Sequence, residues 1–210
     1  MNQTSRFSKL LGECRRQMNG AVAGSMRYYG ADYGLNYGVS LPTIRSLAEL
    51  EGKDHTYSKY LFQQQVREIQ LASLHIAEPH KISESELDFW AAGIINSEIA
   101  EEAAFALFQY VEYATLMGWL SCSNELLVYT ALLSISKNKK VDINSVKQLV
   151  ISNINNESLL IITAIVTLLE SYYRDENNQP IIDEIINSLP STKAAEEIKS
   201  EMEWRCICYK

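Results

Sequence analysis

A chain of 210 residues is long enough to bury a substantial core, and its composition, 47% hydrophobic and 21% charged, is ordinary for a globular protein in water. Nine glycines and four prolines are too few for the many turns of a β-sandwich or barrel. The net charge of −7 excludes a general attraction to nucleic acid or to an anionic membrane, so either partner would need a local basic patch.

The cysteines and the apolar segments bear on the cellular compartment. The amino terminus has no continuous apolar signal segment, and the longest apolar run, residues 159–169, is shorter than the ~20 residues of a membrane-spanning helix. The cysteines lack the spacing of a disulfide framework: Cys14, Cys122, Cys206 and Cys208. We therefore expect reduced thiols, a cytoplasmic location, no membrane association, and no metal or cofactor, even at the Cys206-x-Cys208 pair.

The first half of the chain reads as a series of helices with apolar residues at three- and four-residue spacing. The expected helices cover residues 5–19, 21–29, 42–52, 61–76, 84–95 and 97–110. Gly38 supplies backbone freedom before the third helix, and Pro42 suits its first turn. Residues 83–86 have the form of a capping box, and Asn96 is expected to cap the helix that follows it. The loop 30–38 interleaves tyrosine and glycine, a pattern typical of a base-stacking platform or of a packed turn.

The second half continues the same pattern. The expected helices cover residues 113–120, 126–135, 143–154, 159–173 and 180–189, followed by one that runs from about residue 192 almost to the end. Asp142 can cap one of them. The segment 159–173 is apolar nearly all round, which predicts a central buried helix. Trp90 and Trp119 have apolar neighbours and are expected to be core residues, although either could stack on a base.

The alternation of helix and short polar loop predicts the fold. Pairs of helices about 30–45 residues long are typical of HEAT-type solenoids. We therefore expect an all-α protein, an α-α superhelix of antiparallel helix pairs forming a single domain over residues 1–210, with an irregular helical bundle as the alternative.

Residues 37–77 carry a motif made of helix starts and packing positions. Gly38-Val39-x-x-Pro42-x-x-Arg45 is followed by Leu61-Phe62 and then by Arg67-Glu68 with Leu71-Ala72. With the order and length of the later helices, these features resemble the HEAT-like DNA alkylation repair proteins of the AlkD type over about residues 5–205, where the family usually has Leu-Trp in place of Leu61-Phe62. The resemblance implies a concave groove that cradles DNA and a glycosylase that excises cationic N-alkylated purines. We expect a monomer.

The catalytic residues of that family lie on later helices. The family pattern is a tryptophan and an aspartate four residues apart on one helix, with an arginine from the following repeat. This sequence has Ile99, Ala103 and Tyr129 at the corresponding positions. A register shift of one residue places Glu98 and Glu102 on one helix face, so the candidate carboxylates are Glu98, Glu101 and Glu102. Acidic residues early in a helix also complement its dipole without further function.

Five basic residues are candidates for DNA contacts: Arg45, Arg67, Lys137, Lys139 and Lys140. The two arginines match family positions, yet each could instead pair with a nearby glutamate such as Glu49 or Glu68. The three lysines form the only dense basic cluster, and a solvated loop accounts for them equally well.

Three functions are consistent with these observations. The first is a DNA glycosylase with a rearranged site. The second is a non-catalytic relative that binds branched or damaged DNA through the concave groove. The third is a helical-repeat module for a protein or peptide partner. The substituted catalytic positions leave enzymatic activity open.

Overall fold

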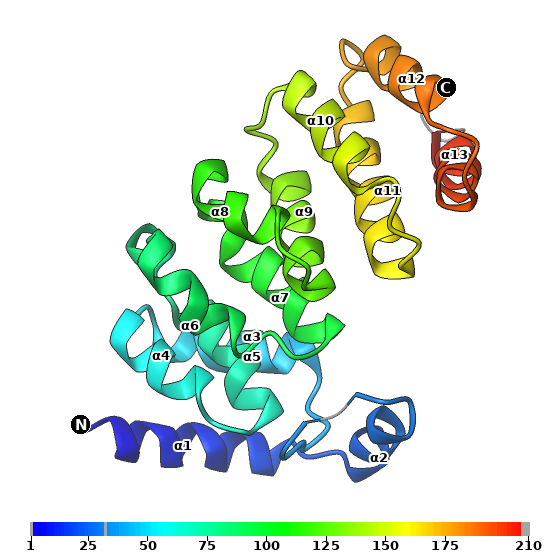
Figure 1. Ribbon diagram of the computed structural model, residues 1–210. Helices are drawn as coiled ribbons and strands as arrows, with labels where there is room; N and C mark the ends of the chain where they lie inside the picture. Colours follow the sequence, from blue (N-terminus) through cyan, green and yellow to red (C-terminus); the bar gives the residue numbers. More distant parts are fainter. Residues whose placement is uncertain (1, 32, 207–210) are drawn as a thin grey trace. The chain divides into compact units, whose positions relative to one another are not determined.

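The computed structural model describes residues 2–31 and 33–206, and every regular element in these ranges is a helix (Figure 1). The helices fall into two compact units, Met1–Leu107 and Phe108–Lys210, which we describe separately. The expected all-α class is confirmed. The expectation that residues 1–210 form a single domain stays a prediction.

The first unit contains seven α-helices and two 3-10 turns among its described residues. The helices are α1 (Gln3–Arg16), α2 (Gly20–Tyr28), α3 (Leu41–Glu51), α4 (His55–Phe62), α5 (Arg67–Ile76), α6 (Leu87–Ala91) and α7 (Ser97–Ala106), with 3-10 turns at Pro79–Lys81 and Glu84–Glu86. Helix α5 is the centre of this unit, because it packs against α3, α4 and α7 and only one of its residues, His75, is not buried.

The second unit is organised around a different helix. Its elements are a 3-10 turn (Phe108–Tyr110), α8 (Tyr113–Leu120), α9 (Glu125–Asn138), α10 (Ile143–Asn153), α11 (Leu159–Tyr173), α12 (Gln179–Ser188) and α13 (Lys193–Cys206). Helix α11 packs against α9, α10, α12 and α13, as its nearly all-apolar sequence predicts. Asp142 caps α10, as expected, by accepting from the backbone N–H groups of Asn144 and Ser145.

The expected helix over residues 61–76 is wrong, because the chain turns between α4 and α5. The backbone N–H of Leu35 donates to the carbonyl of Gln65 at 2.9 Å, and the N–H of Arg67 donates to the carbonyl of Leu35 at 2.8 Å. These bonds form an isolated β-bridge between Leu35 and Val66. Leu35, which is distant in sequence, therefore pairs with the backbone carbonyl of Gln65 and the backbone N–H of Arg67. In a continuous helix these groups would bond to residues of the helix itself.

The expected helix over residues 84–95 is also shorter in the structure, and its capping box does not form. Ser83 hydrogen-bonds to Ser85 at 2.8 Å, while Glu86 accepts from Lys59 and contacts His55. Helix α6 ends at Ala91. The cap at Asn96 is confirmed, since its side chain accepts from the N–H of Ile99 at 3.0 Å.

Two of the three tryptophans, Trp90 and Trp119, lie in the cores of their units. Trp90 is fully buried and Trp119 is 4% exposed, which confirms the expectation that both are core residues. In the Tyr/Gly loop, Tyr33 is buried, so at this position the loop is a packed turn. Among the described residues no helix combines the length and the apolar composition needed to cross a membrane. Cys208, half of the Cys-x-Cys pair, lies outside the described residues.

Gly38 is the position where the fold requires glycine. Its φ is +70°, and a Cβ atom there would lie 2.1 Å from the carbonyl oxygen of Asn19. We predict that Gly38→Ala lowers the free energy of unfolding by about 2 kcal/mol or more, measured by chemical denaturation. The matched control is Gly24→Ala within α2, where no atom lies within 4 Å of the added Cβ. That change is expected to stabilise by about 0.5–1 kcal/mol, and an equal loss in both variants would contradict the prediction.

Candidate functional site

Arg67, the first residue of α5, is a buried cation surrounded by oxygen acceptors. Its Nε donates to Glu98 at 2.8 Å, and its Nη2 donates to the other oxygen of the same carboxylate. Its Nη1 donates to the carbonyl of Val39 at 2.9 Å and to Glu68 at 3.1 Å. Burial acts to lower the pKa of Arg67, but the bonds to Glu98 outweigh it and raise the pKa above its usual value. With only 4% of its side chain exposed, Arg67 presents no cation to a DNA phosphate in this arrangement.

Glu68 extends the same network to the loop before α3. Its fully buried carboxylate accepts from the backbone N–H of Tyr37 at 3.1 Å and from that of Val39 at 3.2 Å. For Arg67 the sequence allows either a contact with DNA or a pair with a nearby glutamate such as Glu68. The structure contains the Arg67–Glu68 pair. This pair joins α5 to the chain that leads into α3.

A second arginine makes a similar contact one helical turn further along α7. Arg45 donates from Nε and Nη2 to the two oxygens of Glu102, at 2.8 and 2.7 Å, and His75 contacts the same carboxylate. Burial acts to raise the pKa of Glu102, but the bonds to Arg45 and His75 outweigh it and lower that pKa to about 2. The partner of Arg45 is thus Glu102, and not Glu49, the nearby glutamate that the sequence suggests.

The three candidate carboxylates differ in burial: Glu102 is buried, Glu98 is half-buried and Glu101 is exposed. Glu98 and Glu102 do share one face of α7, and each is neutralised by a bidentate arginine. The hydroxyl of Tyr33 also donates to Glu98. Glu101 lies at an exposed position of the same helix. A carboxylate already balanced by a guanidinium offers little net charge to a sugar cation developing in a glycosidic cleavage.

The residues at the family's catalytic positions are buried in the structure. Ile99 and Ala103 of α7 are fully buried, and Tyr129 of α9 is 4% exposed. These side chains stabilise the packing of their own units. The structure therefore brings together Arg45, Arg67, Glu98 and Glu102, but as ion pairs.

In the second unit, two of the three predicted lysines border a small cleft. The cleft, of about 140 Å³, lies between the ends of α9 and α11. Its lining includes Lys137, Lys139 and Arg174, a cation that the sequence analysis missed because it lies 35 residues further along the chain. Arg174 is paired with Glu170 at 2.8 Å. Lys140 lies 3.7 Å from Glu112, and both side chains are largely exposed.

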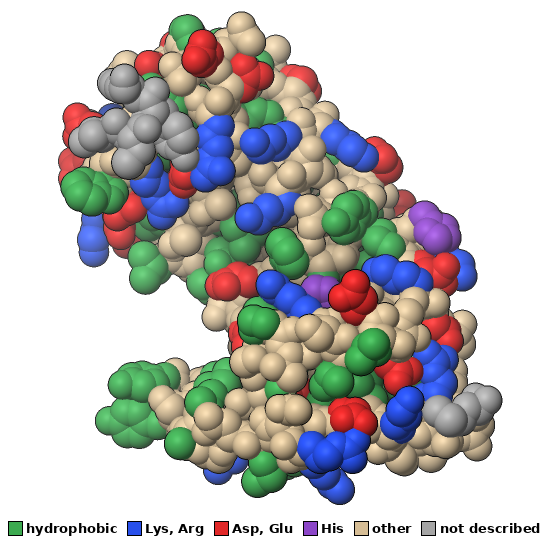
Figure 2. Space-filling view, turned by 180° about the vertical axis from the view of Figure 1, so that it is seen from behind, with side chains coloured by type: hydrophobic (Ala, Val, Ile, Leu, Met, Phe, Trp, Pro, Cys, Tyr) green, Lys and Arg blue, Asp and Glu red, His purple; other side chains and the backbone are tan. Residues whose placement is uncertain are grey.

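An exposed basic and aromatic surface on α1 and α2 was also missed. Residues 1–30 contain five lysines and arginines but one carboxylate, in a chain of net charge −7. Tyr28 and Tyr29 are 83% and 81% exposed, and their rings meet edge to face. In Figure 2, green side chains project at the lower left, where α2 lies in the turned view. We define the α1–α2 surface by the following exposed residues: Arg15, Arg16, Met18, Val22, Arg27, Tyr28 and Tyr29. One of its cations, Arg16, is paired with Glu13.

The depressed pKa of Glu102 leads to a prediction about acid stability. Its pKa is lower in the folded than in the unfolded chain, so its contribution is present above about pH 4.5 and is lost as the pH falls toward 2. We expect Glu102→Gln to cost about 2 kcal/mol of unfolding free energy at pH 7, the effect being limited because Arg45 is 38% exposed. The loss relative to the native chain should shrink as the pH is lowered, followed by denaturation at several pH values.

Glu49→Gln on the neighbouring helix is the matched control for this prediction. Glu49 is exposed and was the alternative partner of Arg45, so its neutralisation should change stability little at any pH. A loss that is the same at pH 7 and at low pH in the Glu102 variant would contradict the assignment.

Comparisons with known proteins bear on the fold. No known protein-family profile matches the chain, and no curated protein does. A solved structure from a family described as related to the HEAT-like repeat DNA glycosylases, with affinity for branched DNA structures, matches 94% of this chain and 94% of its own at a TM-score of 0.76 and 14% identity. A predicted DNA alkylation repair enzyme from Enterococcus faecalis matches 88% of this chain and 95% of its own, at a TM-score of 0.67 and 17% identity. The chain therefore has the HEAT-like repeat fold that its helix pattern and motif predicted.

Proposed function

We propose that the chain is a non-catalytic, nucleic-acid-binding relative of the HEAT-like repeat DNA glycosylases. Binding in the concave groove expected from the resemblance, by a monomer in the cytoplasm, is part of this proposal. The solved structure with the same fold whose family has affinity for branched DNA supports it.

The observation that carries the proposal is the α1–α2 surface. Exposed cations together with exposed aromatic rings are what non-specific binding to nucleic acid needs, because the cations attract phosphates and the rings stack on bases. Arg27 lies beside the two exposed tyrosines in sequence and is itself exposed. The overall charge of −7 would repel nucleic acid, so binding requires such a local surplus of cations.

The ion pairs of α7 support the absence of catalysis. A glycosylase needs a carboxylate whose charge is available to the reacting sugar. In this chain Arg67 neutralises Glu98, and Arg45 neutralises Glu102. We therefore expect purified protein to release no N-alkylated purine from methylated DNA above a no-protein control. Release under conditions where an active glycosylase works would overturn the non-catalytic assignment.

DNA binding itself is tested on the α1–α2 surface. We expect the protein to bind a four-way DNA junction in fluorescence anisotropy, with an affinity that falls steeply between about 50 and 200 mM salt. The combined change Arg27→Ala, Tyr28→Ala and Tyr29→Ala should weaken binding at least about tenfold, because stacking on a base contributes about 1–3 kcal/mol.

The control for this test is Trp204→Ala. Trp204 is 75% exposed but lies between Glu203 and Arg205 on a helix rich in carboxylates. Its removal should leave the affinity for DNA unchanged. Absence of binding to junction, duplex and single strand at low salt would overturn the proposal and favour a protein-interaction module.

The cleft of the second unit that is lined by Lys137 and Lys139, which we call the lysine cleft, gives a separate prediction. If Lys137 and Lys139 contact phosphates, replacing them with Gln and Asn should reduce the salt slope of binding by about one to two units. Asn is chosen at 139 because that residue has a φ of 52°, which Asn tolerates. Lys147→Gln is the matched control, since Lys147 is paired with Glu184 at 3.2 Å. An unchanged slope in the double variant would remove the cleft from the interface.

A further inference from the structure

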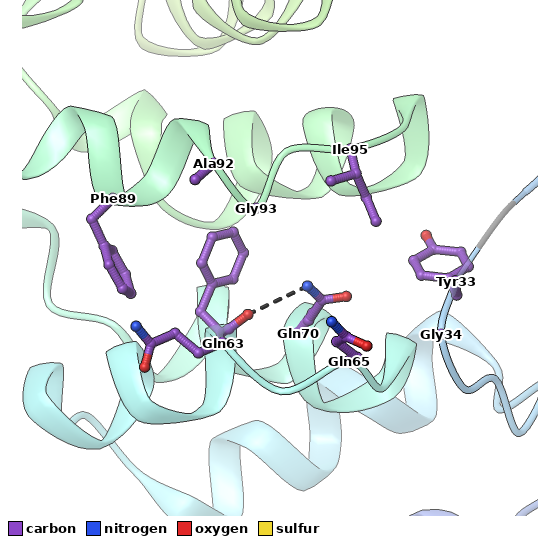
Figure 3. A pocket seen from close by; sticks show the side chains of 10 residues that line it. Tyr33, Gly34, Gln63, Gln65, Gln70, Phe89, Ala92, Gly93 and Ile95 are labelled. Carbon is purple, nitrogen blue, oxygen red and sulfur yellow. Dashed lines mark hydrogen bonds between the residues drawn. The ribbon is translucent and has the colours of Figure 1, made fainter.

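The first unit contains an open cavity of about 590 Å³ outside the paired carboxylates. It lies between the turn that joins α4 to α5, the end of α6 with the turn after it, and residues 33–34 (Figure 3). Its size is within the range of small-molecule sites in proteins. None of the residues lining it carries a charge.

The cavity combines aromatic rings with side-chain amides. The rings are Tyr33, Phe62 and Phe89, and the amides are Gln63, Gln65 and Gln70. Figure 3 shows Phe89 and Gln63 at one end of the cavity, Tyr33 at the other, and Gln65 and Gln70 between them.

The walls of the cavity are held in place by close packing. A Cβ on Gly93 would lie 2.3 Å from the ring of Phe62, and that ring is 4.9 Å from the ring of Trp90, centroid to centroid. The hydroxyl of Tyr33 is tied to Asn96 at 3.2 Å and to Glu98. A site whose rings are already ordered loses little conformational entropy when a ligand enters.

Gln70 is the buried polar group of this cavity. Gln70 is 8% exposed, and the Nε2 of its side-chain amide donates to the backbone carbonyl of Phe62 at 3.3 Å. Among the described residues this is the one hydrogen bond of the Gln70 side chain, and its Oε1 is not among the fully buried polar atoms that lack a partner, so this oxygen is reached by solvent. A largely buried amide whose oxygen is accessible and whose second N–H is available is suited to a ligand that presents the complementary pair.

We infer that this cavity, which we call the glutamine pocket, binds an unstacked, uncharged nucleobase. A planar base supplies two π-faces for the phenylalanine and tyrosine rings and a polar edge for the amides, and glutamine pairs with the N6/N7 edge of adenine. The lack of lining cations excludes a site for a phosphate or carboxylate, so the phosphates of a bound strand would lie outside. The inference rests on the proposed function for a base within DNA, while a free nucleoside offers the same chemistry.

The test compares duplexes that differ only at one extrahelical position. The probes are a duplex with a single unpaired adenine, the same duplex with an abasic residue there, a fully paired duplex, and free adenosine. The protein should bind the probe with the unpaired adenine about tenfold more tightly than the abasic probe. Stacking of one base on an aromatic side chain contributes enough binding free energy in other proteins to account for such a difference. Phe89→Ala and Gln70→Met should abolish this preference and leave binding of the fully paired duplex unchanged.

Gln64→Met is the matched control for Gln70→Met. Gln64 also donates from its amide to a backbone carbonyl, that of Tyr60 at 2.9 Å, but it does not line the pocket. The control variant should retain the preference for the unpaired base. Loss of preference in both methionine variants would overturn a specific role for Gln70.

The outcomes separate this inference from the proposed function. Equal affinity for adenine and abasic probes, in protein that binds the paired duplex, overturns the glutamine pocket and leaves DNA binding intact. Failure to bind any DNA, with saturable binding of adenosine that Phe89→Ala abolishes, overturns the proposed function and assigns the pocket to free nucleosides. Failure to bind both DNA and adenosine overturns both proposals.

Discussion

The buried guanidinium of Arg67 is the constraint on which the first unit depends. Moving a cation out of water costs several kcal/mol unless hydrogen bonds and an opposite charge replace the lost solvent. Glu98 from α7, Glu68 from α5 and the carbonyl of Val39 supply these acceptors. Three segments distant in sequence must therefore come together for this residue to be buried, which explains why α5 lies at the centre of the unit.

This constraint also decides what the acidic residues of α7 can do. Two carboxylates at i and i+4 look like a catalytic pair, yet Glu98 and Glu102 each meet an arginine from another helix. Their charge forms the ion pairs that join α3 and α5 to α7, and it is not open to a substrate. The features on which the proposed binding of nucleic acid depends lie elsewhere: the α1–α2 surface, the lysine cleft and the glutamine pocket.

The central helices of the two units, α5 and α11, are buried for different physical reasons. Helix α11 is nearly all apolar, so the hydrophobic effect is the main reason for its burial among its neighbours. Helix α5 buries Arg67, Glu68 and Gln70 together with its apolar residues. Polar groups in such a place need specific partners, and the same need orders the loops around α5 and leaves one amide, that of Gln70, facing a cavity.

The sequence by itself determined the helical class, most helix positions and the caps at Asn96 and Asp142, because periodicity and capping act over a few residues. It also predicted that Gly38 is needed for its backbone and that Trp90 is a core residue. Only the tertiary structure decided the break between α4 and α5, where Leu35 takes the hydrogen bonds of a continuous helix. It also decided the partners of Arg45 and Arg67 and the convergence of Lys137, Lys139 and Arg174. Such pairings join residues about 30 to 60 positions apart, and charge alone does not select one carboxylate among many at that separation.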